Sequence, residues 1–186
     1  MAVESMRGSL LVATPALVEP TFARTVILLL EHSADDGALG VIVNRPTAAP
    51  LSDVVPAVEE IATEPRVLFD GGPVSRTTAI ALGAVGPGAP AEGWSPVVPP
   101  LVTVDLDHDP ALLAAALRSL RVFAGYAGWS PGQLEGEIAE GSWYVVDSLP
   151  DDPFVPDPSR LRTSVLRRQG WPLAAAAHSP PDPTLN

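Results

Sequence analysis

Cysteine and lysine are both absent from this 186-residue chain, in which all 11 basic residues are arginine. Without cysteine there is no disulfide framework, no thiol nucleophile and no thiolate zinc site. Without lysine there is no Schiff-base chemistry and no P-loop, whose signature ends in Gly-Lys-Ser/Thr. The two absences therefore exclude several common enzyme mechanisms.

Long apolar runs are also missing. The longest uninterrupted ones, 26–30 and 111–117, are much shorter than the roughly 18 residues needed to cross a bilayer. The run at 10–13 is too short for the apolar region of an export signal, which takes about 7–15 residues. We therefore expect a cytoplasmic protein that does not contact a membrane.

The composition is that of a folded, acidic protein. Apolar residues make up 46% and charged residues 18%, and 22 acidic residues give a net charge of −11. This length and apolar content predict one domain with a real core, spanning 1–176. The proline-rich end of the chain predicts a disordered tail at 177–186.

Apolar patterning in the first half favours strands. The segments 25–31 and 39–44 are rich in Val, Ile and Leu, and a Ser-Ala-Asp-Asp-Gly turn separates them, which predicts a hairpin. Such a hairpin, without strict strand–helix alternation, favours an α+β fold. Further strands are expected at 8–13, 66–69, 77–82, 101–107, 122–127 and 142–147, helices at 53–62, 110–120, 131–140 and 159–169, and a Gly/Pro-rich loop at 86–100.

The segment 128–132 matches the G-x-S-x-G pattern of a hydrolase nucleophile between a strand and a helix. However, Pro131 has no N–H to donate to an oxyanion, and His178, the only histidine downstream, lies in the predicted tail. Ser130 and Gln133 have the spacing of a helix-capping box. We interpret the motif as a helix start and assign no catalytic residue.

Polar residues flank the predicted hairpin. His32 lies near its turn, and Asn44 and Arg45 lie at the far end of the second strand, too far away to share a site unless the strands bend. His32 is the one candidate base within the folded part, because histidine titrates near neutral pH, although a structural role is the commoner one. The fork of Arg45 suits a carboxylate or phosphate ligand, or one of the many acidic side chains.

Two glycines, Gly71 and Gly72, follow a predicted strand. Successive glycines can turn backbone amides toward an anion, but a tight turn needs the same residues. The run of alternating acids at 105–109 lacks the glycine and glutamate of a calcium loop, so no metal is predicted, and no cofactor motif is present.

The only basic cluster lies in the last predicted helix, and there is no helix-turn-helix pattern. The strongly acidic chain would repel nucleic acid, which argues against direct DNA binding. The members of the cluster are Arg160, Arg162, Arg167 and Arg168.

Three blocks in this order resemble the YqgE/AlgH family: GSLLVATPAL with Phe22 and TVILLLEHSADDGALGVIVNRP (8–46), VLFDGGPVS (67–75) and VFAGYAGWSPGQLEGEIAEGSWYV (122–145). The resemblance extends to about Arg168. It implies a single bacterial α+β domain whose bifurcated, mostly antiparallel sheet folds into a pseudo-barrel with flanking helices. The family has a transcriptional-regulator label that rests on genetic association, and it supplies no established catalytic residues.

We hypothesise a non-enzymatic regulatory module that binds a small ligand or a protein partner; the sequence does not set the oligomeric state. The alternatives are a hydrolase that acts on an anionic substrate through His32, and a transcriptional regulator acting indirectly rather than by binding DNA. The candidate ligand-binding residues are His32, Asn44, Arg45, Gly71, Gly72, Trp129 and Gln133.

Overall fold

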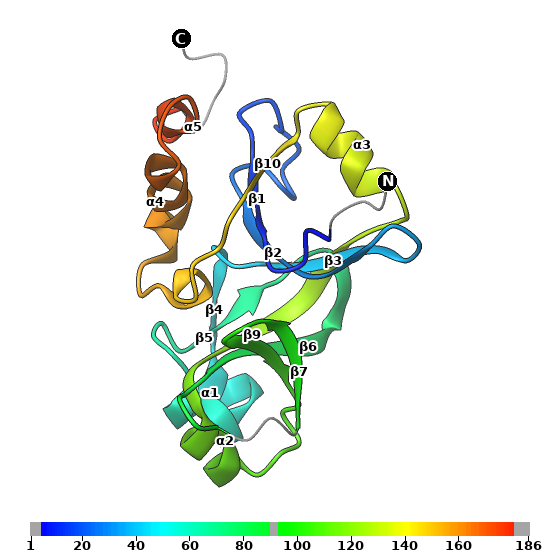
Figure 1. Cartoon of the computed structure of the whole chain (residues 1–186). Helices are drawn as coiled ribbons and strands as arrows, with labels where there is room; N and C mark the ends of the chain where they lie inside the picture. The colour runs from blue at the N-terminus through cyan, green and yellow to red at the C-terminus, as the bar shows by residue number, and fades with distance from the viewer. Residues whose placement is uncertain (1–4, 90–92, 181–186) are drawn as a thin grey trace.

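A curled, mostly antiparallel sheet forms most of the molecule (Figure 1). The computed structural model describes residues 5–89 and 93–180. Within these residues the strands are β1 (Leu10–Ala13), β2 (Val26–Ser33), β3 (Gly37–Ile42), β4 (Pro46–Pro50), β5 (Val67–Asp70), β6 (Val74–Val85), β7 (Trp94–Val98), β8 (Leu101–Val104), β9 (Leu117–Trp129) and β10 (Trp143–Val146).

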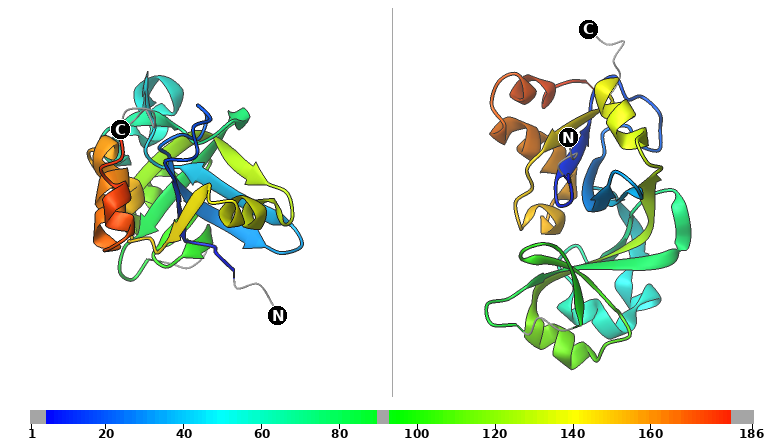
Figure 2. Two further views of the ribbon diagram at one scale, coloured as in Figure 1. Left: turned by 90° about the horizontal axis from the view of Figure 1, so that it is seen from above. Right: turned by 45° about the vertical axis from the view of Figure 1, so that its right-hand side comes forward.

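The strand order is β10-β1-β2-β3-β9-β6-β8-β7, and the short pair β4–β5 joins through β9. The long strand β9 connects the two halves, because its C-terminal end pairs with β3 and its remaining length pairs with β6 and, in parallel, with β5. The two halves are visible as an upper and a lower lobe (Figure 2). The predicted single-domain α+β fold with a bifurcated, curled sheet is confirmed, and the curl forms a half-barrel.

The predicted hairpin is confirmed as β2–β3, with His32 opposite Ala38 and Ser33 opposite Gly37. Gly37 closes the turn with a φ of +89°, which glycine adopts without the strain other residues suffer. A Cβ at this position would lie 2.1 Å from the carbonyl oxygen of Trp129, so the turn fits against β9 only because this side chain is absent.

The helices are short and lie at the ends of the sheet. In Figure 1, α1 and α2 close the lower lobe, while α4 and α5 run along one side of the upper lobe. Their bounds are α1 (Leu51–Val54), α2 (Pro110–Ala116), α3 (Gln133–Ala139), α4 (Leu161–Arg168) and α5 (Leu173–Ala176), with 3₁₀ turns η1 (Pro56–Ile61), η2 (Asp152–Phe154) and η3 (Pro158–Arg160).

Three local predictions differ from the structure. The helix expected at 53–62 is split into α1 and η1, because Val55 precedes a proline and is held outside the helical region, at φ −140°. The helix expected at 110–120 ends at Ala116, and the chain continues as β9, whose pairing with β6 begins at Leu117. The loop expected at 86–100 contains the strand β7.

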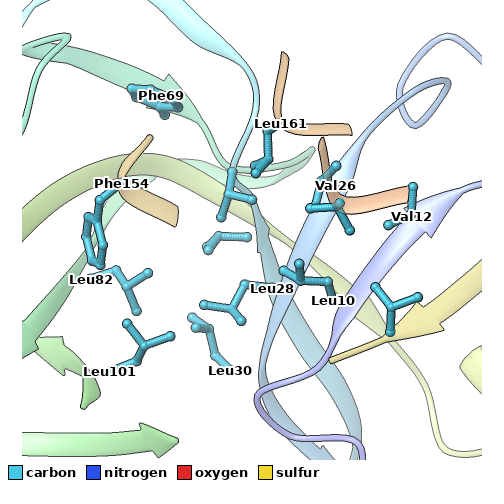
Figure 3. Close-up of a cluster of buried hydrophobic side chains, with 14 of the residues drawn as sticks. Leu10, Val12, Val26, Leu28, Leu30, Phe69, Leu82, Leu101, Phe154 and Leu161 are labelled. Carbon is cyan, nitrogen blue, oxygen red and sulfur yellow. The ribbon is translucent and has the colours of Figure 1, made fainter. Parts of the chain in front are cut away.

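Both faces of β1 and β2 are buried, as their apolar sequences predict. On one face, alternate side chains such as Leu10 and Leu28 join the largest core cluster, and those between them, such as Leu11 and Ile27, join a second cluster beneath α3. Figure 3 shows Leu161 of α4 beside Val26 in the first cluster. The helix α4 therefore covers the sheet with its apolar face.

The end of the described chain packs on this cluster. Ala177 is buried, and the Arg24 guanidinium donates to the carbonyl of Ser179 at 3.2 Å. The predicted disordered tail begins in this segment, and its residues 181–186 lie outside the described part. No helix of the described ranges has the length and apolar character to span a membrane.

Candidate functional site

A groove lies where the N-terminal segment meets the β2–β3 hairpin. The N–H of Gly8 donates to the carbonyl of Leu29 at 2.8 Å, and the Ser148 hydroxyl donates to the carbonyl of Gly8 at 2.6 Å. These bonds hold the preceding residues beside β2. Two hollows of about 360 and 290 Å³ adjoin there, and they share Arg7, Glu31 and Leu39. We call the combined hollow the Arg7 groove.

The two halves of the Arg7 groove differ in chemistry. The polar half has the side chains of Ser5, Arg7, Glu31, His32, Ser33 and Asp36 in its lining. The apolar half lies between the ends of β2 and β3 on one side and β6, β7 and β8 on the other, and its lining includes Leu30, Leu39, Ile80, Pro96 and Val97. One cleft thus joins a charged end to an apolar end.

Irregular pairing in β2 brings consecutive residues into this groove. Successive strand residues normally point to opposite faces, yet Leu30 and Glu31 both line it. The register between β2 and β3 shifts between Leu29 and Glu31, and such an irregularity re-aims side chains locally.

The two charged groups at the junction are available to a ligand. Arg7 and Glu31 are exposed, and within the described ranges neither the Arg7 guanidinium nor the Glu31 carboxylate has an ion pair or side-chain hydrogen bond. Because an arginine fork binds carboxylates in a fixed geometry and a carboxylate accepts from ammonium or guanidinium groups, the pair can recognise both charges of one molecule.

His32 forms part of the wall, and both of its ring nitrogens are engaged. Its side chain is only 1% exposed. Nδ1 accepts the N–H of Met6 at 3.1 Å, which places the proton on Nε2, and Nε2 donates to Oε1 of Glu135 at 2.8 Å. The histidine therefore joins the N-terminal segment, the hairpin and α3.

Glu135 supplies the other half of this pair. The pKa of its carboxyl is lowered below 4.5, first by a hydrogen bond from its own backbone N–H and then by the bond from His32. The carboxylate is the form that accepts both bonds, so the interaction is that of an ionised acid with an imidazole N–H.

The hydroxyls of the groove also have partners. Ser5 Oγ donates to the carbonyl of His32 at 3.0 Å, and Ser33 Oγ donates to Asp36 at 2.9 Å. No serine among the described residues donates its hydroxyl to a ring nitrogen of His32. The groove thus has binding groups without an assembled nucleophile and base.

Glu137 of α3 links Trp129, the last residue of β9, to Gln133, the first residue of α3. Oε2 of Glu137 accepts from the indole N–H of Trp129 at 2.9 Å and from that of Trp143 at 2.8 Å, and Oε1 accepts from Gln133 Nε2 at 3.0 Å. The ring centroids of Trp129 and Trp143 lie 6.1 Å apart in an edge-to-face arrangement. This cluster fixes α3 on the second core cluster.

The predicted capping box is half formed. The side-chain carbonyl of Gln133 accepts the N–H of Ser130 at 3.1 Å, but the Ser130 hydroxyl does not cap the helix. Gly132, with φ +76°, stands between them, so α3 begins two residues later than predicted. The serine thus starts the turn before the helix.

Asn44 and Arg45 lie at the opposite end of the hairpin. Asn44 accepts the N–H of Val26 at 2.9 Å and donates to the carbonyl of Arg24 at 3.1 Å. The Arg45 guanidinium donates to the backbone carbonyls of Pro20, Thr21 and Ala23. Both side chains hold the loop before β2 and do not reach the Arg7 groove.

Gly71 and Gly72 follow β5, where the chain runs beside the parallel strand β9. A Cβ on Gly71 would come within 2.3 Å of the carbonyl oxygen of Gly125, and one on Gly72 within 2.3 Å of the carbonyl carbon of Tyr126. The N–H of Gly71 donates to the carbonyl of Ala124 at 2.9 Å. The two glycines allow this close backbone approach, and the amide of Gly71 is not directed at a ligand.

Of the seven predicted residues, the structure places His32 in the wall of the groove, Trp129 at the end of β9 and Gln133 at the start of the neighbouring helix α3. The sequence argument did not select Arg7, Glu31, Glu135 and Glu137 as candidate residues, although Glu31 is the neighbour of His32 at the end of the predicted strand. Glu137 lies four residues after Gln133 in the predicted helix, and this i, i+4 spacing was an available signal for the bond between their side chains. Within the described ranges, His, Asp and Glu side chains form no cluster of three that could hold a metal.

Comparison with known proteins identifies relatives along most of the chain. A family model described as AlgH-like matches residues 10–174. A UPF0301 protein of Streptomyces avermitilis is 51% identical, over 99% of this chain and 97% of the relative, and one of Mycobacterium tuberculosis is 45% identical, over 96% and 90%.

Solved structures show the same fold. A crystal structure from Corynebacterium diphtheriae matches with a TM-score of 0.89 and 33% identity, over 95% of this chain and 94% of that one. The solution structure of AlgH from Pseudomonas aeruginosa matches with a TM-score of 0.70 and 26% identity, over 97% of both. The chain therefore belongs to the AlgH-like family.

Proposed function

We propose that this protein is a binding module without catalytic activity and that the Arg7 groove takes its ligand. The observation that carries the proposal is that two hollows of different chemistry share Arg7, Glu31 and Leu39. A cleft of this size that combines an apolar lining with a few convergent polar groups is typical of small-molecule sites.

The charges of the groove indicate the class of ligand. Arg7 suits a carboxylate, whereas Glu31 and Asp36 suit an ammonium or guanidinium group. The adjoining apolar half suits an aliphatic or aromatic portion. These three features together match an amphipathic zwitterion, such as an apolar amino acid or a short peptide.

Binding is favoured over hydrolysis by the way His32 is held. Its Nδ1 already accepts a hydrogen bond from the N–H of Met6, and its Nε2–H already donates one to the carboxylate of Glu135. To act as a base toward a ligand, the ring would have to give up one of these bonds. A hydrolase that depends on His32 is thus the weaker alternative, and activity that survives His32→Ala would reject it.

A ligand screen tests the proposal. Amino acids and dipeptides are added to the ¹⁵N-labelled protein, and backbone chemical shifts are followed. We expect a ligand to perturb the amides of residues 5–8 and 30–39. We also expect Arg7→Ala and Glu31→Gln each to weaken its binding about tenfold, which is the usual worth of a charge-assisted bond.

Arg66→Ala is the matched control, because Arg66 is exposed and pairs with Glu64 outside the groove. It should leave binding unchanged. The proposal fails if no compound binds, if the perturbed amides lie elsewhere, or if Arg66→Ala weakens binding as much as Arg7→Ala does.

A regulatory role that acts through such a ligand, rather than through DNA, fits the arrangement of the C-terminal arginines. Arg162 is buried and donates to the carbonyls of Ala13 and Ala176, and Arg168 pairs with Asp152 at 2.6 Å. Two of the four cationic groups are therefore used within the fold, which leaves little charge for the several phosphates that DNA binding must neutralise.

A further inference from the structure

The C-terminal helices form a basic face on an acidic protein. The segment 158–180 contains four arginines and no acidic residue, whereas the rest of the chain has seven arginines and all 22 acidic residues. In Figure 1, α4 and α5 of this segment run along one side of the molecule. This segment is thus the basic cluster of the chain, and two of its arginines, Arg160 and Arg168, pair with Asp157 and Asp152, which precede it.

The outer side of α4 has the form of a shallow recognition surface. Its inner side buries Leu161, Val165 and Leu166 in the core. A hollow of about 740 Å³ lies on the other side, and its lining is entirely polar: Ser159, Arg160, Thr163, Ser164, Arg167 and Arg168. Since Arg168 pairs with Asp152, the cations free to turn outward are those of Arg160 and Arg167.

The partners of these two cations are weak. Arg160 pairs at 3.1 Å with Asp157, but its own side chain is 86% exposed, so water screens the pair strongly. Arg167 contacts a histidine nitrogen, Nε2 of His178, at 3.2 Å and not a carboxylate. Both can therefore accept an external anion at little cost.

An exposed indole lies just beyond the helix. Trp171, in the turn between α4 and α5, is 85% exposed, more than any other large apolar residue that the structure describes. Tryptophan and arginine are the side chains that most often carry the binding energy of protein interfaces. The segment thus has an exposed aromatic side chain three residues after the end of α4, in addition to the two cationic groups that line the hollow.

We propose that the basic face, which we define by Arg160, Arg167 and Trp171, docks an acidic segment of a partner protein. A short acidic segment matches both its charge and its extent. The eight residues of α4 span only about 12 Å, whereas duplex DNA carries a charge about every 1.7 Å along its whole length. A duplex would run past this face onto the acidic remainder of the surface. The basic face shares no residue with the Arg7 groove, so the two sites can be tested separately.

Fluorescence anisotropy with a labelled peptide tests the proposal. The probe is a 12-residue peptide of glutamates with one central leucine, titrated with the full-length protein at 50 mM NaCl. We expect the double variant Arg160→Glu/Arg167→Glu to bind about tenfold or more weakly, because both cations become repulsive. Trp171→Ala should also weaken binding about tenfold, without any change in the net charge of the protein.

The control is Arg66→Glu/Arg76→Glu, which changes the net charge by the same amount. Arg66 and Arg76 are also exposed and paired with acids, Glu64 and Asp70, outside the basic face. The control should bind the peptide within about twofold of wild type. An unchanged unfolding temperature for all variants shows that the losses are not caused by unfolding.

Five results would overturn the proposal, and three of them come from the titrations with the peptide. These are no measurable binding by wild type, an equal loss in the control double variant, and no loss in Arg160→Glu/Arg167→Glu. The fourth is tighter binding to a 20-base-pair duplex than to the peptide at the same salt, which would assign the face to nucleic acid. If light scattering instead shows a dimer that the double variant abolishes, the occupant is a second copy of this chain, and the proposed partner is wrong.

Discussion

Glu137 is the residue that holds Trp129, Trp143 and Gln133 together. Its carboxylate accepts two indole N–H groups and the Gln133 amide, so one side chain satisfies donors from β9, β10 and α3. Trp129 and Trp143 are 6% and 4% exposed. Their indole N–H groups would therefore stay without a hydrogen-bond acceptor if this carboxylate were removed, because little water reaches them. The arrangement of these side chains thus depends on hydrogen bonds within the fold.

Glu137→Ala should therefore lower the free energy of unfolding by about 2–4 kcal/mol, because two buried donors lose their partner. Glu137→Gln retains one acceptor oxygen and should cost about half as much. Glu140→Ala, at an exposed position of the same segment, is the control. Urea unfolding measures all three. A loss below about 0.5 kcal/mol for Glu137→Ala would contradict this role.

The His32–Glu135 pair predicts a dependence of stability on pH. Because the pKa of Glu135 is lowered in the folded protein from its ordinary value of 4.5, the carboxylate stabilises the fold. That contribution is complete above about pH 4.5 and is lost as the pH falls through the lower folded pKa.

We therefore expect the advantage of wild type over Glu135→Gln, measured by urea unfolding, to be largest above about pH 5 and to shrink as the pH falls below 4.5. The control, Glu140→Gln, removes an exposed carboxylate from the same segment and gives the background. An advantage of wild type that grows toward pH 3 would contradict the assignment.

At the scale of elements, the β2–β3 hairpin is positioned by one glycine. Gly37→Ala would place a methyl group 2.1 Å from the carbonyl oxygen of Trp129 and also strain a φ of +89°. Gly88 has a similar φ of +76°, and a Cβ at this position would meet no other atom within 4 Å. The substitution Gly88→Ala therefore adds backbone strain alone.

We expect Gly88→Ala to cost about 1–2 kcal/mol and Gly37→Ala to cost at least about 2 kcal/mol more, since a backbone atom cannot move aside cheaply. Chemical unfolding of the two variants measures the difference. Equal losses would show that the hairpin does not press against β9 as described.

The long strand β9 is tied to the loops beside it by a buried arginine. Arg121 donates to the carbonyls of Glu64 at 2.6 Å, Pro153 at 2.8 Å and Val155 at 3.3 Å, and its guanidinium carbon lies 4.3 Å above the ring of Phe69. Burial lowers the pKa of Arg121 to about 10. The fork geometry lets one side chain serve three carbonyls from two loops.

Arg121→Lys keeps the charge but loses the fork, so we expect it to cost about 2–4 kcal/mol of unfolding free energy. Arg118→Lys is the matched control on the same strand, because Arg118 forms only an exposed pair with Asp151. It should cost less than about 0.5 kcal/mol. Thermal and urea unfolding measure both. Similar losses would contradict the structural role of the fork.

The elements that the sequence predicted well are those with local signals. The hairpin has a glycine turn between two apolar runs, and both features lie within one short stretch. At the start of β9 the local signal is misleading, because a helical spacing of leucines continues through Leu112, Leu113, Leu117 and Leu120. The chain is nevertheless extended from Leu117 onward, where it pairs with β6. Tertiary pairing overrides the periodicity there.

The candidate site was predictable only in part for the same reason. His32 stands out in the sequence as a histidine beside a turn, but its partner Glu135 is 103 residues away and carries no sign of the pairing. Arg7 lies outside the strands, and long-range bonds of its neighbours Ser5, Met6 and Gly8 bring it to the groove. Asn44 and Arg45 were predicted to bind a ligand because they are polar residues at the end of a strand. Polar residues at such positions also hold adjacent loops by hydrogen bonds, which is what these two do.

At the scale of the whole molecule, charge is distributed unevenly. Segment 158–180 contains four arginines and no acidic residue, and the remainder of the chain has about three acidic residues for every basic one. Repulsion among these acids opposes the compact state, because folding brings them closer together than they are in the unfolded chain. The half-barrel must therefore be stabilised chiefly by the apolar core beneath it.

Salt should consequently stabilise the protein and weaken the proposed docking of an acidic peptide. Raising NaCl from about 20 to 200 mM shortens the screening length from roughly 20 to 7 Å, which reduces the repulsion between acidic groups in the folded state. We expect the unfolding temperature to rise by a few degrees over this range.

In the same range, the peptide affinity of the basic face should fall about tenfold, because its attraction is also electrostatic. Differential scanning calorimetry and anisotropy, run in the same buffers, measure the two trends. Sucrose matched for osmolality is the control, and it should leave the peptide affinity unchanged. An unfolding temperature that falls with salt would show that attractive pairs such as Arg168–Asp152, and not repulsion between acids, dominate the electrostatics of the fold.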